Sequence, residues 1–149
     1  MSGKSDTWEN GWLLLFFNNV AFADVGDGPG LQPSGTVGSL YMSLHTQSPT
    51  VTGNQGSYEV TYASYARTAV PRASGAGGWS ISGDGVSLVD DVEFTEGTAG
   101  GSPTATHFGI GSDISGSGHL FYFGELSPTI VTGEGVTPVI DSGLIIDER

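Results

Sequence analysis

The chain has 149 residues, no cysteine, 25 glycines and 7 prolines, and its 16 carboxylates outnumber 4 lysines and arginines to give a formal net charge of −12. Without cysteine it has neither a disulfide framework nor a thiolate metal site, and its negative charge opposes contact with nucleic-acid phosphates. This length gives room for one self-sufficient core, so we expect a single domain over residues 1–149.

No membrane segment is expected near the start of the chain. The apolar run from Trp12 to Phe17 is six residues long, whereas a helix needs ~20 apolar residues to cross a bilayer. Apart from Lys4, no basic leader precedes this run, so we also expect no secretory signal.

Residues 1–20 are predicted to contain the one helix. Asp6 is the expected N-cap, and Glu9 stands three positions later in a capping-box relation. Apolar side chains then spread around most of the helix circumference: Trp8, Trp12, Leu13, Leu14, Leu15, Phe16 and Phe17. Such a helix is covered on more than one side. It either plugs the open end of its own sandwich or contacts a second subunit, and Asn18-Asn19 ends it.

The rest of the chain has the pattern of many short strands. Glycine and proline mark residues 24–38 as a long loop. Residues 39–45 form the clearest strand, with Leu40, Met42 and Leu44 on one face. Nine or ten such strands at a spacing of about 8–12 residues are typical of sandwiches and barrels. We therefore predict an all-β fold, a two-sheet jelly-roll-like β-sandwich with one N-terminal helix.

Several later stretches carry specific expectations. Residues 58–62 alternate as a strand, and residues 83–85 form a hairpin tip. Residues 119–126 carry apolar side chains on both sides, which predicts a strand buried on both faces at the centre of the second sheet. Gly109 and Gly111 lie on one face of their strand and allow a neighbouring sheet or backbone to approach closely.

No catalytic motif or metal site is apparent. The histidines, His45, His107 and His119, are too far apart in sequence for a short ligand spacing, so ordinary hydrogen bonds are expected of them. The acidic clusters lack the spacing of an EF-hand loop. We expect a protein that is not an enzyme and has no cofactor.

Two arginines are informative because positive charge is scarce. In so acidic a chain Arg67 and Arg72 can each pair with a carboxylate. Arg67 lies within a predicted strand, where its partner either fixes that strand within the chain or joins two subunits. We favour the pair within one chain.

Five stretches, taken in order, resemble small bacteriophage structural proteins that are described as tail-fibre-like proteins or as capsid decoration (cement) proteins. These stretches are residues 4–10, 40–49, 62–79, 106–111 and 135–138. The resemblance spans nearly the whole chain. It implies a non-enzymatic virion protein that assembles in repeated copies, commonly as dimers or trimers.

Our leading hypothesis is a decoration protein on the capsid exterior, made in the host bacterial cytoplasm. It would bind the major capsid protein and stabilise the assembled head shell by mass action, as a homo-oligomer without nucleic-acid or membrane partners. The predicted subunit or capsid interface comprises the loop 24–38 and seven residues: Trp8, Trp12, Leu13, Phe16, Phe17, Arg67 and Arg72.

The alternative is a tail-associated fibre or adhesin module. Aromatic loop residues, namely Tyr58, Tyr62 and Trp79, would then contact host surface polysaccharide. A third hypothesis, a small carbohydrate-active enzyme, needs two carboxylates in one cleft, and the sequence nominates no such pair.

Overall fold

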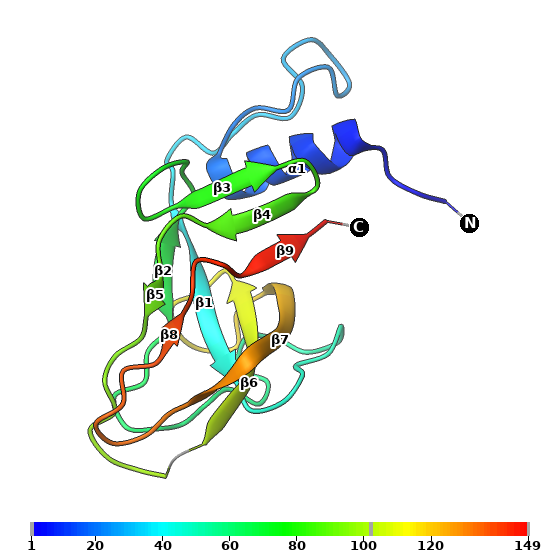
Figure 1. Ribbon diagram of the computed structural model, residues 1–149. Coiled ribbons are helices and arrows are strands. Elements are labelled where there is room, and N and C mark those ends of the chain that lie inside the picture. Colours follow the sequence, from blue (N-terminus) through cyan, green and yellow to red (C-terminus); the bar gives the residue numbers. More distant parts are fainter. Residues whose placement is uncertain (1, 102, 149) are drawn as a thin grey trace. The chain divides into compact units, whose positions relative to one another are not determined.

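The computed structural model describes residues 2–101 and 103–148, and these contain one helix and nine strands (Figure 1). The elements are α1 (Asp6–Asn18), β1 (Ser39–His45), β2 (Thr68–Pro71), β3 (Trp79–Ser82), β4 (Gly85–Leu88), β5 (Val92–Glu93), β6 (Thr104–Gly111), β7 (Leu120–Val131), β8 (Val139–Ile140) and β9 (Ile145–Asp147). We predicted an all-β fold with one N-terminal helix, and the described residues are mostly β with such a helix. None of the described helices is long and apolar enough to cross a membrane.

The described strands form three sheets, with orders β2-β1-β6-β7, β3-β4-β9 and β5-β8. The pairs β1–β6, β6–β7, β3–β4, β4–β9 and β5–β8 are all antiparallel. These orders do not identify the jelly roll that we expected, because that fold places two sheets face to face through Greek-key connections.

The chain divides into two compact units. Unit 1 comprises Met1–Ser39, Pro71–Asp91 and Asp141–Arg149, and unit 2 comprises Leu40–Val70 and Val92–Ile140. Each unit therefore joins segments that are distant in sequence. The expectation of one domain over the whole chain stays a prediction.

Helix α1 of unit 1 begins one residue earlier than its predicted cap implied. Ser5 is the N-cap, with an extended backbone and a side chain that accepts a hydrogen bond from the Trp8 amide at 3.3 Å. Asp6 is the first helical residue, so the predicted cap was wrong, and Glu9 lies one position too far along for a capping box. The C-cap, Asn19, has a φ of 55°, which agrees with the predicted helix end.

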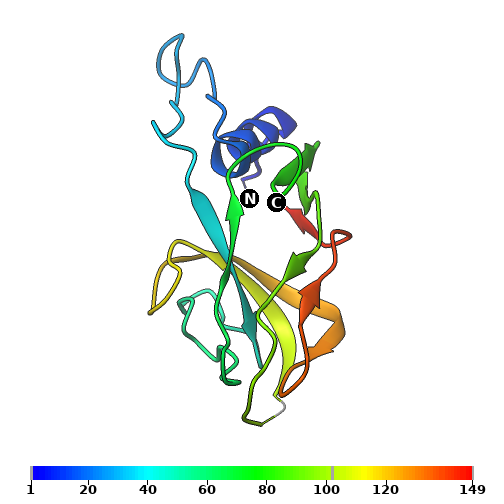
Figure 2. The ribbon, with the colours of Figure 1, turned by 90° about the vertical axis from the view of Figure 1, so that its left-hand side faces the viewer.

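Unit 1 is built on the packing of α1 against the hairpin of β3 and β4 (Figure 2). The rings of Phe17 and Trp79 meet edge to face with their centroids 4.7 Å apart, and both side chains are buried. Trp79 pairs with Leu88 and Ser82 with Gly85. This register leaves residues 83–84 as the turn, so the predicted hairpin is confirmed.

Unit 2 contains the four-stranded sheet and its core. β1 pairs with β6 from Tyr41 opposite Gly111 to His45 opposite His107. The apolar face that the alternation of β1 predicted is buried, with Met42 and Leu44 inaccessible to solvent.

Two strand predictions in unit 2 were wrong. β7 lies at an edge of its sheet instead of the centre, and its Phe121 side chain is exposed. The aromatic residues on both sides of β7 therefore did not indicate burial on both faces. Residues 58–62 form no strand beyond an isolated bridge between His45 and Glu59, because Tyr58 has a φ of 56° that interrupts an extended backbone.

Candidate functional site

The buried polar side chains of unit 2 include a serine and a histidine in direct contact. The Ser43 hydroxyl lies 2.8 Å from His45 Nε2, and His45 Nδ1 lies 2.7 Å from the Ser57 carbonyl oxygen. A carbonyl oxygen only accepts, so Nδ1 carries the proton and Nε2 accepts from Ser43. Burial lowers the pKa of His45 below its ordinary value of 6.5.

This serine–histidine pair has the geometry of an activated nucleophile, but substrate cannot reach it. Both side chains have 0% exposure. A Cβ on Gly109 would lie 2.6 Å from the Ser43 hydroxyl and 2.7 Å from His45 Nε2, so a glycine is needed for β6 to approach them. The groups that approach this glycine are side chains of its own sheet and not a neighbouring sheet or backbone as predicted, and the pair is an internal hydrogen-bonded contact. The described residues contain no cluster of potential metal ligands.

The polar contacts of Arg67 define the candidate site, which we call the Arg67 platform: the loop 46–58, residues 59–67 and the loop 112–118. Arg67 Nε donates to Glu59 Oε1 at 2.8 Å, and Nη2 donates to Glu59 Oε2 at 2.9 Å. Nη1 donates to the Asp113 carbonyl at 2.9 Å, and Nη2 also donates to the Gly116 carbonyl. The pair within one chain that the sequence favoured is thus present, and this guanidinium connects two segments of the platform.

Gln55 connects the two loops of the platform. Its Oε1 accepts from the Asp113 amide at 2.9 Å, and its Nε2 donates to the Tyr41 carbonyl at 3.3 Å. Gln55 is buried, and a Cβ on Gly111 would overlap its side chain at 2.0 Å. The second glycine of the predicted small-residue face therefore makes room for Gln55.

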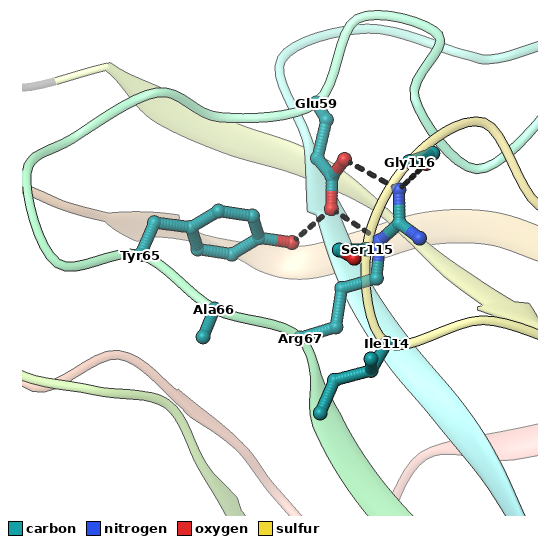
Figure 3. Close-up of a pocket in the computed structure, with 7 residues that line it drawn as sticks. All are labelled: Glu59, Tyr65, Ala66, Arg67, Ile114, Ser115 and Gly116. Carbon is teal, nitrogen blue, oxygen red and sulfur yellow. Dashed lines mark hydrogen bonds and ion pairs between the residues drawn. The ribbon is translucent and has the colours of Figure 1, made fainter.

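A hollow of about 170 Å³ opens on this platform (Figure 3). Its lining residues are Glu59, Tyr65, Ala66, Arg67, Ile114, Ser115 and Gly116. The Tyr65 hydroxyl points toward the Glu59 carboxylate in Figure 3 and donates to Oε1 at 2.7 Å. The hollow thus combines a paired acid and base with apolar and hydroxyl groups.

The surroundings of the hollow favour the charged form of Arg67 and the neutral form of Tyr65. The hydrogen bonds to Glu59 raise the pKa of Arg67, and burial together with the charge of Glu59 raises the pKa of Tyr65. The side chain of Arg67 is 3% exposed and that of Glu59 is 16% exposed. Glu59 therefore reaches solvent while Arg67 lies beneath the surface.

Of the three aromatic residues that we predicted to contact polysaccharide, two are buried and one is exposed. Tyr62 and Trp79 are buried, at 3% and 0% exposure, so their predicted role in contacting a ligand was wrong. Tyr62 donates from its hydroxyl to the Thr95 carbonyl at 2.9 Å. Tyr58 is 53% exposed and lies on the Arg67 platform.

The predicted interface residues separate into two groups. Arg67 lies on the platform of unit 2, and the other six lie in unit 1: Trp8, Trp12, Leu13, Phe16, Phe17 and Arg72. Leu13 and Phe17 are buried in the fold, and Trp8 is exposed. Trp12 and Phe16 are half-buried and stack with ring centroids 5.6 Å apart. Their role as an interface stays a prediction.

The sequence allowed Arg72 to pair with a carboxylate, but within residues 2–101 and 103–148 it has no such partner. Its Nε donates to the Phe16 carbonyl at 2.6 Å and its Nη2 to the Leu15 carbonyl at 2.7 Å, while Nη1 donates to the Ser34 hydroxyl at 2.8 Å. Arg72 therefore satisfies carbonyls in the last turn of α1, where four carbonyls have no partner within the helix.

Sequence reasoning missed Glu59, Gln55 and the loop residues Ile114 and Ser115. One signal was available for Glu59: an arginine in a chain with few cations needs a nearby acid, and Glu59 precedes Arg67 by eight residues. The loop 112–118 carried only turn composition and had no comparable signal.

Comparison with known proteins gives one family. A family model described as "Podophage GP4 fiber I protein gp80" matches residues 3–145. No curated protein matches the chain.

Proposed function

Because this chain belongs to the family of podophage GP4 fiber I protein gp80, we propose that it is a tail-associated fibre component that contacts polysaccharide on the host surface. As a member of this family it is a non-enzymatic structural protein of a podophage virion fibre. The match supports the fibre alternative over the capsid-decoration hypothesis. The major capsid protein was a partner only under the decoration hypothesis, and nothing supports it here.

The observation that carries the proposed contact is the Arg67 platform. Binding residues are often found on loops that a rigid scaffold positions, and the loops of the platform are held by the buried side chains of Arg67 and Gln55. Tyr58, Ile114 and Ser115 are exposed on it. Polar groups beside exposed apolar side chains suit a sugar, which presents hydroxyls at its rim and C–H groups on its faces.

The full chain should bind polysaccharide purified from the bacterium that the phage infects, and should slow adsorption of the phage when added first. Biolayer interferometry measures the first effect, and counting of unadsorbed phage measures the second. Polysaccharide from a strain that resists adsorption is the control. Absence of binding, together with hundreds of copies per particle by quantitative gel staining, would overturn the proposal and favour a decoration protein.

A further inference from the structure

We propose that two copies of the chain pair through the edge of β7, antiparallel about a two-fold axis at Tyr122. This contact goes beyond the proposed function, because it concerns a second copy of the chain and not a ligand. The edge of a sheet presents amide and carbonyl groups to which another strand can add. Three features of β7 favour such a partner: an open edge, exposed aromatic side chains, and an acid and a base placed symmetrically about Tyr122.

The four-stranded sheet has two edges, and they are protected to different degrees. At one edge, β2 has four residues and ends at Pro71, which has no amide hydrogen to donate. At the other edge, β7 has twelve residues, and no described strand pairs with its outer side. Pro128 interrupts the donors of β7 near its end. Residues 119–125, which we call the β7 strip, contain no proline and no lysine, so another strand can join the edge there.

The hydrogen bonds of the sheet indicate which backbone groups of the strip point outward. The Leu44 carbonyl accepts from the Val60 amide at 3.0 Å, on the side of β1 away from β6. Successive residues of a strand point these groups to opposite sides, so His45 points toward β6, where it pairs with His107. His107 therefore points toward β1. Glu125, which lies opposite His107 in β7, then points its amide and carbonyl away from the sheet.

The side chains of the strip are accessible along one face of the edge. Phe121 is 42% exposed, Glu125 is exposed and Phe123 is half-buried. Residues two apart in a strand share a face, so these three side chains follow one another. The rings of His119 and Phe121 have centroids 6.5 Å apart, which places His119 beside them. By the same alternation, the backbone groups of Phe123 point outward like those of Glu125.

The strip is complementary to a second copy of itself. Antiparallel pairing about Tyr122 places Glu125 of each copy opposite His119 of the other, and Phe123 opposite Phe121. An imidazole N–H can donate to a carboxylate, and aromatic pairs across strands are stabilising. The two-fold axis makes each contact twice. An acid on an edge strand discourages pairing when it meets another acid, but in this register Glu125 meets a donor.

The contact is weak by itself. Stable interfaces bury about 1,200–2,000 Å², and a strip this short buries less, while the formal charge of −12 repels a second copy. We expect a Kd of about 1 mM. The pair is then dissociated at the concentrations of a chromatography column and is separate from any oligomer formed by α1. Copies held side by side in one fibre reach effective concentrations of about millimolar, at which the pair forms.

The first test is an NMR titration of the full ¹⁵N-labelled chain from about 0.05 to about 2 mM, a range that brackets the expected Kd. The amide signals of the β7 strip should shift with concentration as two copies pair. Phe121→Glu adds a carboxylate to the edge and should weaken pairing by about tenfold. Val51→Glu is the matched control, because it adds the same charge at a side chain that is 90% exposed on the loop 46–58. It should pair within about twofold of wild type.

A charge exchange tests the register. His119→Asp places an acid opposite Glu125 of the other copy and should weaken pairing by about fivefold. Adding Glu125→Lys to the same chain should restore pairing, because each lysine then lies opposite an aspartate of the other copy.

A cysteine at the axis tests the register independently, since the chain has no cysteine of its own. In Tyr122→Cys the two thiols lie opposite each other, with Cα atoms about 4.5–5.5 Å apart as in any antiparallel pair, a separation that a disulfide spans. This variant should form a disulfide-linked dimer in a buffer of oxidised and reduced glutathione. Val131→Cys, at an exposed residue at the far end of β7, should remain unlinked.

Several outcomes would overturn the inference. Signals of the strip that stay constant up to about 2 mM would exclude the pair and leave the edge to a strand of another protein. Equal weakening by Phe121→Glu and Val51→Glu would show that net charge alone controls association. Failure of Glu125→Lys to restore pairing, or equal crosslinking of Tyr122→Cys and Val131→Cys, would show that the register is wrong. Shifts confined to α1 would assign the contact to that helix instead.

Discussion

Arg67 and Glu59 show how one ion pair positions several backbone segments. Removing one partner of a buried pair leaves an uncompensated charge, which costs roughly 3–5 kcal/mol. Here the guanidinium also donates to two carbonyls of the loop 112–118, so the pair holds the loop as well as the charge. Lysine keeps the charge but cannot reproduce this planar fork of donors.

His45 makes the stability of the protein depend on pH. Its pKa is lowered by burial, against smaller opposing effects of the Ser57 carbonyl and Glu59, while Arg67 and His107 lower it further. The folded chain therefore binds fewer protons at this site than the unfolded chain. Stability from His45 is fully present above the unfolded pKa of 6.5 and is lost as the pH falls below it.

We expect the free energy of unfolding to fall by up to about 1.4 kcal/mol per pH unit below that value because of this one group. Urea denaturation at a series of pH values measures the slope. His45→Gln should remove this part of the slope, whereas His119→Gln, at an exposed residue, should retain it. Equal slopes in all three proteins would show that His45 does not titrate as argued.

At the scale of elements, α1 is held in unit 1 by contacts near its middle and in its last turn. Asn10 Nδ2 donates to the Gly83 carbonyl at 2.9 Å at the turn of the β3–β4 hairpin. Phe17, near the end of the helix, packs on Trp79, and Arg72 binds carbonyls of the last turn. The last turn has no basic residue of its own, so Arg72 supplies the positive charge that favours a helix C-terminus.

Arg72→Ala should lower the free energy of unfolding by about 1–3 kcal/mol, because it leaves two partly buried carbonyls without their charged donor. Thermal or urea denaturation followed by circular dichroism measures the loss. Lys4→Ala is the matched control in the same unit, since Lys4 forms a solvent-accessible pair with Glu148. That substitution should change stability by less than about 1 kcal/mol, and a similar loss in both variants would contradict the role of Arg72.

At the scale of the whole molecule, a formal charge of −12 keeps copies of the chain apart unless apolar contacts offset the repulsion. The aromatic residues of α1 are the candidates for such a contact. Trp8 is exposed on this helix, and Trp12 and Phe16 are half-buried. We therefore retain the proposal that α1 contributes to a homo-oligomer.

Changing Trp12 and Phe16 together to serine should abolish the oligomer, as measured by light scattering after size-exclusion chromatography. The control pair, Val51→Ser with Val131→Ser, removes exposed apolar side chains from unit 2 and should leave the oligomer intact. A monomeric wild-type chain that unfolds in one step would overturn the proposal, and α1 would then act only within its own chain.

Local sequence patterns were enough to predict the elements whose form depends on a few consecutive residues. The alternation of β1, the turn between β3 and β4 and the end of α1 at Asn19 were all predictable, because side-chain direction and turn chemistry are properties of a few consecutive residues. The resemblance to phage structural proteins likewise implied the non-enzymatic character of the family to which the chain belongs.

Only the tertiary structure decided which faces of those elements are buried and which groups their side chains contact. β7 has aromatic residues on both sides, but its place at a sheet edge leaves Phe121 exposed. Arg72 donates to carbonyls of α1, because the chain brings it to the end of that helix from a segment distant in sequence. The hollow beside Arg67 depends on residues 59–67 meeting the loop 112–118, and no local spacing encodes a contact between segments so far apart in sequence.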